Sequence, residues 1–340
     1  MRAIQVIQKG DVRIIETELP QDLGETEVLV RTKAAGICGS DMHIYHGTNP
    51  FVKYPRIIGH EAVGEVAKTG RAVTTLKPGD RVVLEPIESC GTCYACRIGR
   101  PNICEKLLVR GVMKDGGFQE YFTAFEDKLH RFPDTLDWDE AVLLEPFTIG
   151  AQACFRGGVL KGDLVLIVGA GPTGLAVLEN AKRLGATCIL SDLNDNRLAF
   201  GKAFGADHVV NPQAEDLRAA VARISGGMMC NVTVDAVGTP QTLMDCIELT
   251  SVAARVVCMG FTSTLAQVSL QKITQKELSI VGSRLQTHQF AGCVEAFAAR
   301  KPELTRLITH RFDFTEIQAA FDLIENKPLE VGKIVLHFNR

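Results

Sequence analysis

The sequence predicts an α/β protein of two domains, one rich in β-strands and one built on a doubly wound parallel sheet. Its 340 residues exceed the length at which a single hydrophobic core usually stops growing. Residues 1–150 carry short β-type apolar runs interrupted by glycine and proline. After residue 151 apolar strands alternate with helical patterns, which is typical of a parallel sheet covered by helices.

The individual elements support this division in chain order. The first domain contains the strand patterns EVLVRTKAAGI and DRVVLEPI, and a Pro-Gly turn signal precedes the second. The second domain opens with DLVLIVGAGPTGLAVLENAKRLGATCILSD, which predicts a strand, a glycine turn, a helix ending near Gly185 and another strand. After about residue 290 the pattern is helical and ends in GKIVLHF, a strand that could return to the first domain's sheet.

Charge and apolar content are those of an ordinary globular enzyme. The formal net charge is −3, so neither nucleic acid nor an acidic membrane surface is an expected partner. The N-terminal residues show no signal peptide, and no apolar run is long enough to span a membrane. We therefore expect a cytoplasmic protein that acts on a small molecule.

Four cysteines lie close together in CGTCYACRIGRPNIC, with the spacing C-x2-C-x2-C-x7-C. Zinc takes four tetrahedral ligands, so this set closes its coordination shell and predicts a structural zinc site. An iron–sulfur cluster is the alternative that four thiolates also suit. The ligands would be Cys90, Cys93, Cys96 and Cys104. Six other cysteines are scattered among apolar neighbours and are expected to be small buried side chains.

The motif GAGPTG follows an apolar strand and opens a periodic helix, which is typical of a dinucleotide site. Gly169 permits the turn, Gly171 lets the backbone approach a pyrophosphate, and Gly174 allows close packing of helix and strand. Asp192 ends the second strand and can accept hydrogen bonds from ribose hydroxyls, which favours NAD over NADP. Two alternatives remain, because Asp192 could simply cap a turn and Arg197 could accept a phosphate.

A second metal site is suggested by three separated segments. Cys38 lies in GICGSDMH, His60 and Glu61 stand together in IIGHEAVGE, and Glu145 lies in LLEPF. A thiolate, an imidazole and a carboxylate suit a zinc ion with an open position. Each residue also has an ordinary alternative: core packing for the cysteine, a satisfied loop histidine, and helix-end charges for the two carboxylates.

These segments and the other motifs named at the end of this paragraph follow one another along the chain with ordinary gaps. Together they resemble the zinc-dependent medium-chain dehydrogenases from end to end. Within that family the chain is most similar to the sorbitol, threonine and hexonate 5-dehydrogenases, especially the bacterial L-gulonate and starvation-sensing types. The resemblance implies a GroES-like catalytic domain around an inserted Rossmann domain. The catalytic domain would comprise residues 1–150 completed by 290–340, and the NAD-binding domain residues 151–289. The motifs that carry the resemblance are GICGSDMH, GHEAVGEV, PGDRVVLEP, the four-cysteine loop, DGGFQEY, LLEPFTIG, VGAGPTG and VGSR.

The resemblance also implies roles for individual residues. Cys38 and His60 would bind a catalytic zinc, and the third protein ligand is left open between Glu61 and Glu145. The zinc would acidify an alcohol so that hydride passes to NAD, while Ser40 and then His43 carry the proton to solvent. Two zinc ions per chain follow, one catalytic and one structural.

The resemblance further implies cofactor and substrate contacts. The expected reaction is oxidation of the secondary alcohol of a sugar acid or polyol to a ketone. The best candidate is the oxidation of L-gulonate to D-fructuronate. The protein is expected to be a homodimer or homotetramer. Alternatives are a sorbitol, polyol or threonine dehydrogenase and, in a different class, a non-enzymatic zinc- and nucleotide-binding regulator. The substrate would touch Tyr45, Phe118 and Arg284. The cofactor would touch Gly169, Gly171, Pro172, Thr173, Gly174, Asp192, Arg197, Gly260 and Arg284.

Overall fold

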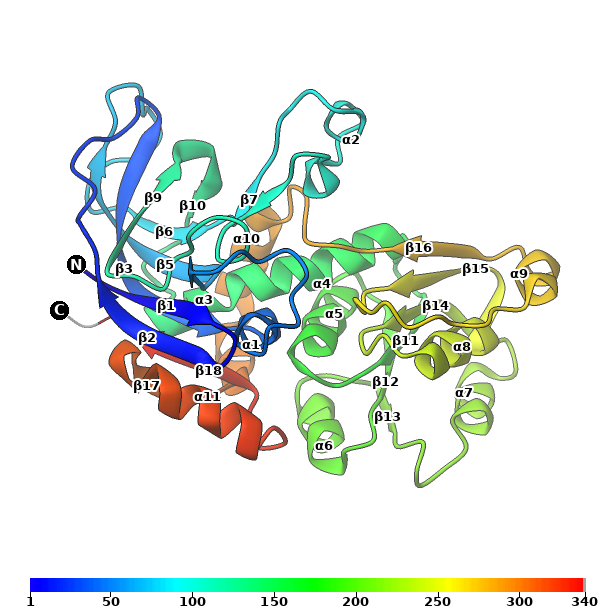
Figure 1. Cartoon of the computed structure of the whole chain (residues 1–340). Helices are drawn as coiled ribbons and strands as arrows, with labels where there is room; N and C mark the ends of the chain where they lie inside the picture. The colour runs from blue at the N-terminus through cyan, green and yellow to red at the C-terminus, as the bar shows by residue number, and fades with distance from the viewer. Residues whose placement is uncertain (339–340) are drawn as a thin grey trace. The chain divides into compact units, whose positions relative to one another are not determined.

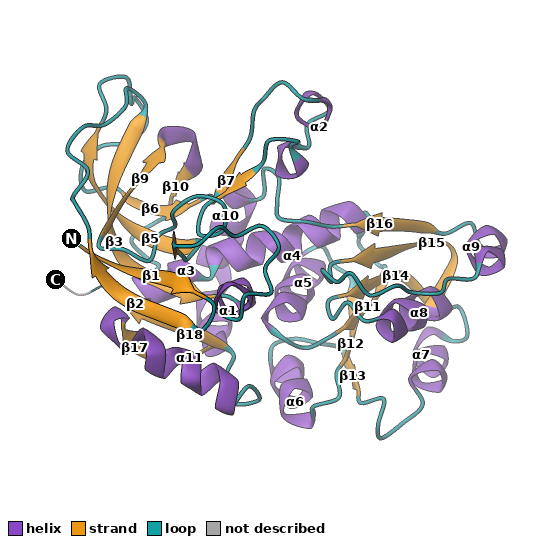
Figure 2. Cartoon of the chain, viewed as in Figure 1, coloured by secondary structure: helices purple, strands orange, loops and turns teal. Residues whose placement is uncertain are grey.

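The computed structural model describes residues 1–338, except for the side chains of residues 300–304. Contacts within the chain divide it into two compact units (Figure 1). Unit 1 combines Met1–Glu145 with the chain from Phe290 onward, and unit 2 is the intervening segment Pro146–Gln289. Strands dominate unit 1, whereas strands and helices alternate in unit 2 (Figure 2). The predicted fold class is confirmed.

The main sheet of unit 1 has seven strands in the order β10-β6-β5-β3-β18-β17, with β9 also paired to β3. Smaller sheets have the orders β2-β1-β4 and β7-β8. The strands are β1 (Arg2–Gln8), β2 (Asp11–Glu16), β3 (Glu27–Ile37), β4 (Arg56–Ile57), β5 (Glu61–Thr69), β6 (Arg81–Leu84), β7 (Ile87–Glu88), β8 (Leu108–Val109), β9 (Tyr121–Phe125), β10 (Leu129–Arg131), β17 (Ile308–Asp313) and β18 (Lys333–His337). The helices are α1 (Gly39–Tyr45), α2 (Tyr94–Arg97), α3 (Trp138–Val142), α10 (Phe290–Leu304) and α11 (Ile317–Asn326), and α4 (Leu144–Gly157) begins here and continues into unit 2.

Strand β3 organises the functional residues of unit 1. Its sequence EVLVRTKAAGI is small or apolar at most positions, and most of its residues are buried. It runs antiparallel to β5, with Gly36 opposite Glu61, and to β18, with Ile334 opposite Ile37. Because of this antiparallel pairing, the end of β3 meets the beginnings of β5 and β18. Segments far apart in the sequence therefore converge at one point of the sheet.

Unit 2 contains a six-stranded parallel sheet in the order β13-β12-β11-β14-β15-β16. The strand order reverses between β11 and β14, and nucleotides bind outside the carboxyl ends of the strands at such a point. The strands are β11 (Leu164–Val168), β12 (Thr187–Ser191), β13 (His208–Val210), β14 (Cys230–Asp235), β15 (Thr250–Cys258) and β16 (Ser279–Gly282). The helices are α5 (Pro172–Arg183), α6 (Asp195–Ala203), α7 (Leu217–Ser225), α8 (Pro240–Leu249) and α9 (Leu270–Lys276).

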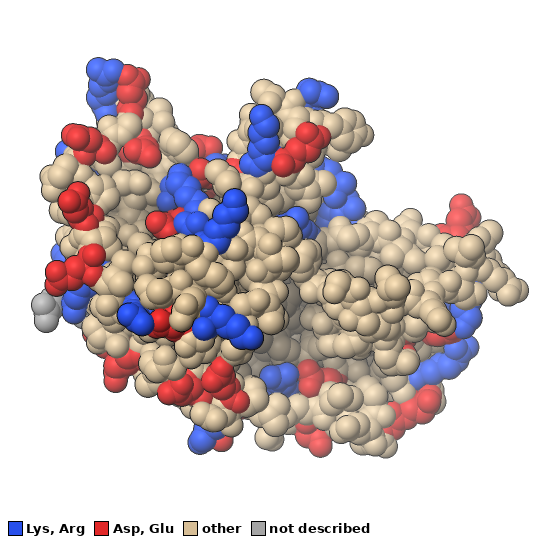
Figure 3. Space-filling model, viewed as in Figure 1, with Lys and Arg blue, Asp and Glu red and all other residues tan. Residues whose placement is uncertain are grey.

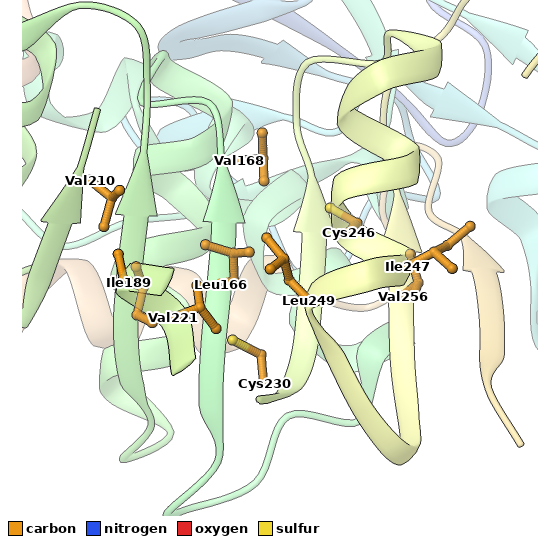
Figure 4. Close-up of a cluster of buried hydrophobic side chains, with 11 residues drawn as sticks. Leu166, Val168, Ile189, Val210, Val221, Cys230, Cys246, Ile247, Leu249 and Val256 are labelled. Atoms are coloured by element: carbon orange, nitrogen blue, oxygen red, sulfur yellow. The ribbon is translucent and has the colours of Figure 1, made fainter. Parts of the chain in front are cut away.

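The core beside this sheet contains two of the six scattered cysteines. Side chains from the strands pack against those of α7 and α8, and Cys230 and Cys246 lie among them (Figure 4). Burial raises the pKa of the Cys230 thiol to about 12, so it stays protonated and behaves as an apolar side chain. Cys154, Cys188 and Cys293 are also buried, whereas Cys258 is only partly so. The structure thus gives these thiols a packing role.

Basic and acidic side chains are interspersed on the visible face of the molecule (Figure 3), as expected for a net charge of −3. Within the described residues, no helix combines the length and apolarity needed to cross a membrane.

Close packing of α4 on α5 generates a stability prediction. A methyl group at Gly150 would lie 2.3 Å from the carbonyl carbon of Ala176, so the helix backbones would have to separate. We expect Gly150→Ala to lower the free energy of unfolding by roughly 1–3 kcal/mol, measured by urea denaturation. Gly292→Ala in α10 is the matched control, because no neighbouring atom lies within 4 Å of its added methyl group. A destabilisation no larger than that of the control would contradict the packing argument.

Candidate active site and metal centres

Cys38, His60 and Glu61 form a compact cluster of possible metal ligands in unit 1. Cys38 caps the N-terminus of α1 directly after β3, and the other two residues begin β5. One ligand atom from each residue lies within 4.8 Å of those of the other two. Gly36 makes this possible, because a Cβ atom there would lie 2.2 Å from Oε2 of Glu61. The antiparallel pairing of β3 and β5 therefore brings together three of the four candidate ligands, which come from two separate motifs.

Asp41 fixes the backbone on both sides of this cluster, a role that the sequence analysis did not identify. Its carboxylate accepts hydrogen bonds from the N–H groups of Cys38, at 2.9 Å, and Gly59, at 3.2 Å. The side chain is fully buried. Burial raises the pKa of Asp41, although the positive charge of His60 and the two backbone N–H groups oppose this shift. Asp41 therefore ties the cysteine segment to the histidine segment.

Lys333 is a second residue that the sequence analysis missed, and it neutralises Glu61. Its Nζ atom donates to both carboxylate oxygens of Glu61 at 2.7 Å and to the carbonyl oxygen of Ile37 at 3.1 Å. Both side chains are at most 4% exposed. A buried ion pair of this kind is strongly destabilised when one partner is removed, because the other charge remains uncompensated. The pair therefore fixes the position of the Glu61 carboxylate.

Glu145 occupies the first turn of α4 and completes the polar surroundings of His60. The residue is 3% exposed. Burial raises the pKa of Glu145 to about 7, although the charge of His60 acts in the opposite direction. Burial alone would lower the pKa of His60, but the negative charges of Cys38, Asp41 and Glu145 raise it well above its ordinary value. Electrostatic coupling thus joins Glu145 to the cluster.

The donor set fits a divalent metal ion. Ionised Cys38, Asp41, Glu61 and Glu145 would carry four negative charges, against two positive charges, on Lys333 and on protonated His60. Such an excess of buried negative charge is costly without a compensating cation. The buried Nδ1 of His60 has no hydrogen-bond partner among the described residues. Thiolate, imidazole and carboxylate are the ligand types of catalytic zinc sites, so the residues fit zinc.

The two predicted relay residues lie on α1. The buried Oγ of Ser40 has no hydrogen-bond partner within the described part of the chain. His43 is exposed, and its Nδ1 lies 3.0 Å from Oγ1 of Thr48. Since Cys38 caps the same helix, all three residues belong to one short rigid element.

Two predicted substrate contacts of unit 1 have other packing roles in the structure. Phe118 is fully buried, and a Cβ atom at Gly59 would lie 1.9 Å from its ring. The ring of Phe118 therefore fills the space that Gly59 leaves, and its contact with a substrate stays a prediction. Tyr45 is partly exposed, and its ring lies 5.0 Å from that of Phe321 in α11. The Nε2 of Gln318 is 3.4 Å from the Tyr45 hydroxyl, so α11 supports this side chain.

Residues 89–109, the four-cysteine lobe, contain Cys90, Cys93, Cys96 and Cys104. These four side chains fit a closed metal site. One Sγ atom from each of its cysteines lies within 4.8 Å of the others. The Sγ of Cys93 is 3.5 Å from that of Cys96 and 3.8 Å from that of Cys104. Sulfur atoms at the corners of a zinc tetrahedron would be about 3.8 Å apart, given Zn–S bonds near 2.3 Å. Backbone N–H groups of Cys90 and Lys106 also point at the Cys104 sulfur, at 3.3 and 3.2 Å.

The glycine motif of unit 2 has the predicted turn geometry. Gly169 has a φ of +104°, which favours glycine, and a Cβ atom at Gly174 would lie 1.8 Å from its carbonyl oxygen. Gly171 caps α5, with open space where its side chain would be, and Pro172 and Thr173 form the first turn. The helix N-terminus therefore presents N–H groups to an open surface that can receive phosphate.

Asp192 braces this glycine loop. Its Oδ2 accepts a hydrogen bond from the N–H of Ala170 at 2.7 Å, and its Oδ1 accepts one from the N–H of Asn194 at 2.9 Å. The turn-capping alternative therefore describes part of its role. A carboxylate oxygen has two lone pairs, so the same group can also accept hydrogen bonds from a ribose. Arg197 lies in the first turn of α6, where its N–H donates to Asn194.

The remaining predicted cofactor residues also lie at the carboxyl ends of strands. Gly260 follows β15, and a Cβ atom there would lie 2.0 Å from Cα of Gly238, which follows β14. Arg284 follows β16, and its guanidinium carbon lies 5.7 Å from the ring centre of Phe261. The parallel sheet therefore collects these residues at the same edge as the glycine loop.

Family models match both parts of the chain. One, described as the alcohol dehydrogenase GroES-like domain, matches residues 24–134, and another, described as zinc-binding dehydrogenase, matches residues 172–299. Relatives match along nearly the whole length. The starvation-sensing protein RspB of Escherichia coli K12 is 39% identical, with both chains fully covered. The L-galactonate-5-dehydrogenase of the same organism is 35% identical over 92% of each chain, and human sorbitol dehydrogenase is 33% identical over 92% of this chain and 89% of its own.

Solved structures agree with these matches. An alcohol dehydrogenase from E. coli CFT073, complexed with NADH, is 39% identical and has a TM-score of 0.93 over 99% of each chain. The L-idonate 5-dehydrogenase of E. coli K-12 is 28% identical, with a TM-score of 0.91 over 99% of this chain and 98% of its own. Sequence identity, coverage and fold together show that the chain is an oxidoreductase of the zinc-dependent medium-chain family, the zinc-binding alcohol dehydrogenases.

Proposed function

We propose that the protein oxidises a secondary alcohol of a sugar acid to a ketone, using zinc and NAD. The observation that carries this proposal is the cluster of Cys38, His60 and Glu61, with Glu145 coupled to it, in a chain of this family. When bound there, zinc supplies Lewis acidity that makes a substrate hydroxyl more acidic. The glycine loop of unit 2 would hold NAD, which would supply the hydride acceptor.

We assign Glu145, rather than Glu61, as the third protein ligand in the resting enzyme. Both oxygens of Glu61 are occupied by Lys333, so binding a metal would require this carboxylate to share or exchange its partner. Glu145 lies close enough to His60 for their charges to interact. A metal ion would favour its ionised form, opposing the pKa increase that burial causes.

Ser40 and His43 provide a route for the substrate proton. The Ser40 hydroxyl is buried and without a hydrogen-bond partner in the described chain, so it can accept a proton from the substrate hydroxyl and pass its own onward. His43 is exposed and can release a proton to solvent, with its ring oriented by Thr48. Both side chains come from α1, whose N-cap is the proposed ligand Cys38.

The best candidate substrate is L-gulonate, oxidised at its fifth carbon to D-fructuronate. Two relatives are named for oxidation of hexonates at this carbon, the L-galactonate-5-dehydrogenase of E. coli and the L-idonate 5-dehydrogenase of Vitis vinifera, which is 34% identical. Arg284 offers a guanidinium that can pair with a terminal carboxylate in two parallel hydrogen bonds. The second candidate is a neutral polyol such as sorbitol, which the similarity to sorbitol dehydrogenases favours.

The two metal sites should differ in lability. Four thiolates close the coordination shell of the lobe metal, whereas the Cys38–His60 site keeps an exchangeable position. We expect a mild chelator to remove one zinc ion per chain together with activity, while the other ion remains bound. Metal analysis during chelation measures this, and Cys96→Ser, which removes one ligand of the lobe site, identifies the retained ion. Two results would overturn the assignment of one catalytic and one structural zinc ion. One is activity that falls only as both metals leave, and the other is iron in the lobe.

Asp192→Ala should weaken NAD binding more than tenfold and relax discrimination against NADP. The substitution removes a ribose acceptor, and hydrogen bonds to a charged group contribute roughly 1.5–3 kcal/mol each. It also removes the negative charge that repels a 2′-phosphate. Binding titrations with both cofactors measure the effect. Since Asp192 also braces Ala170, Asn194→Ala serves as a control that disturbs the neighbouring turn without removing the charge. An unchanged NAD/NADP ratio in Asp192→Ala would show that the residue only caps the turn.

Arg284→Ala should raise KM for L-gulonate far more than for sorbitol. Loss of a charge-assisted pair with the substrate carboxylate costs about 2–3 kcal/mol, a penalty that a neutral polyol would not suffer. The measurement is kcat/KM for both compounds, with Arg223→Ala, an exposed arginine of unit 2, as the control. A wild-type protein that prefers sorbitol, or an equal loss for both substrates, would remove the sugar acid from the proposal.

A further inference from the structure

The segment that leaves the four-cysteine lobe packs directly on the backbone that carries His60. The N–H of Gly116 donates to the carbonyl of Ile57 at 2.8 Å, and the N–H of Phe118 donates to that of Ile58 at 3.1 Å. The N–H of Gly117 donates to the carbonyl oxygen of Gly59 at 2.8 Å. Three hydrogen bonds therefore hold the residues that immediately precede His60.

Glycines make this contact unusually close. A Cβ atom at Gly111 would lie 2.7 Å from the carbonyl carbon of Gly59, and one at Gly116 would lie 2.2 Å from its carbonyl oxygen. Gly59 itself has a φ of +90° and leaves room for the ring of Phe118. Backbone thus meets backbone without an intervening side chain. A displacement of the Gly111–Phe118 segment would consequently be transmitted to Gly59 and its neighbour His60.

The same segment is anchored to the base of the lobe. The Nε of Arg110 lies 2.9 Å from Oε1 of Glu88, and the Nζ of Lys114 lies 3.1 Å from the same oxygen. Arg110 is buried, and its N–H donates to the carbonyl of Pro86 at 2.9 Å. Glu88 lies two residues before Cys90, the first cysteine of the lobe. The ion cluster therefore connects the entry and exit strands of the lobe to the segment that holds His60.

The lobe has little apolar core to maintain its own shape. Among its residues 89–109, all of which the structure describes, the buried apolar side chains are Ala95, Cys104 and Val109. Without a metal, four thiols would be left to fill its centre. Structural zinc sites supply the folding free energy of such small modules, which are often unfolded without the ion. Occupancy of the four-cysteine site should therefore determine how firmly the exit segment is held.

We propose that the metal in the four-cysteine lobe positions His60, so that metal binding at the two sites is positively coupled. This inference rests on the two metal sites of the proposed function. Gly111, Gly116 and Gly117 are the positioning residues, and they act through the backbone of Gly59. Thermodynamic linkage makes the coupling reciprocal, so metal at Cys38 and His60 must strengthen retention of metal in the lobe by the same factor.

The test is a cobalt titration of the Cys38–His60 site, followed by the thiolate-to-cobalt absorption band. The lobe retains zinc in every protein titrated except the double cysteine variant. Gly116→Ala should weaken cobalt binding at least tenfold, because its methyl group would displace Gly59 while all four lobe cysteines remain. The double variant Cys93→Ser, Cys96→Ser, which cannot close the lobe site, should weaken it at least as much. Gly292→Ala is the matched glycine control, and Gly150→Ala controls for general loss of stability.

The outcomes separate this inference from the proposed function. No cobalt band in the wild-type protein would refute the proposed catalytic site itself. A normal wild-type band with equal affinity in Gly116→Ala would overturn the coupling alone, as would equal weakening in Gly150→Ala. If the double cysteine variant fails to fold, Gly116→Ala and the reciprocal measurement decide the matter. In that measurement the rate of zinc release from the wild-type lobe to a chromogenic chelator should fall when cobalt occupies the other site.

Discussion

Buried negative charge around Cys38 is the constraint on which the functional part of unit 1 depends. Asp41 and Glu61 are almost fully excluded from water, where an uncompensated carboxylate would be very costly. Each has a specific compensation: two backbone N–H groups for Asp41, and the Lys333 ammonium for Glu61. Cys38 and Glu145 lie close enough to His60 for their charges to interact with its ring. The buried charges of Asp41 and Glu61 are therefore each stabilised by a specific partner.

This requirement explains why the chain returns to its first sheet. Lys333 is 272 residues from Glu61 in sequence, and β18 brings it there by pairing with β3. The intervening chain contains the whole of unit 2, so that unit is an insertion into a fold that is incomplete without its last strand. A strand that only extended the sheet could tolerate an apolar residue at its first position. Here that position carries a buried cation, so β18 contributes directly to the cluster of candidate metal ligands.

Sequence reasoning identified the elements whose signal is local. The four-cysteine spacing, the glycine turn between a strand and a helix, and the parallel-sheet pattern each follow from neighbouring residues, and the fold class was confirmed. The roles of Asp41 and Lys333 could not be predicted from the sequence, because their hydrogen-bond partners are brought close only by the tertiary structure. Asp41 did lie inside GICGSDMH, and its acceptor capacity at the first turn of a helix was an available signal. The substrate contact of Phe118 stays a prediction, because a motif position cannot show whether an aromatic ring points into a pocket or into the core.

Glycines are essential to the candidate sites of this chain, because these sites depend on how closely one backbone segment approaches another segment or a side chain. Gly36 admits the Glu61 carboxylate, and Gly174 lets α5 approach the carbonyl of Gly169. In both cases a methyl group would collide with a named functional or backbone atom. Side chains in the same motifs are then positioned by the backbone, as Cys38 is by its place at the helix N-cap. Glycine therefore provides the spacing, and cysteine, histidine and carboxylate provide the chemistry, which is why the motifs are recognisable only when both are read together.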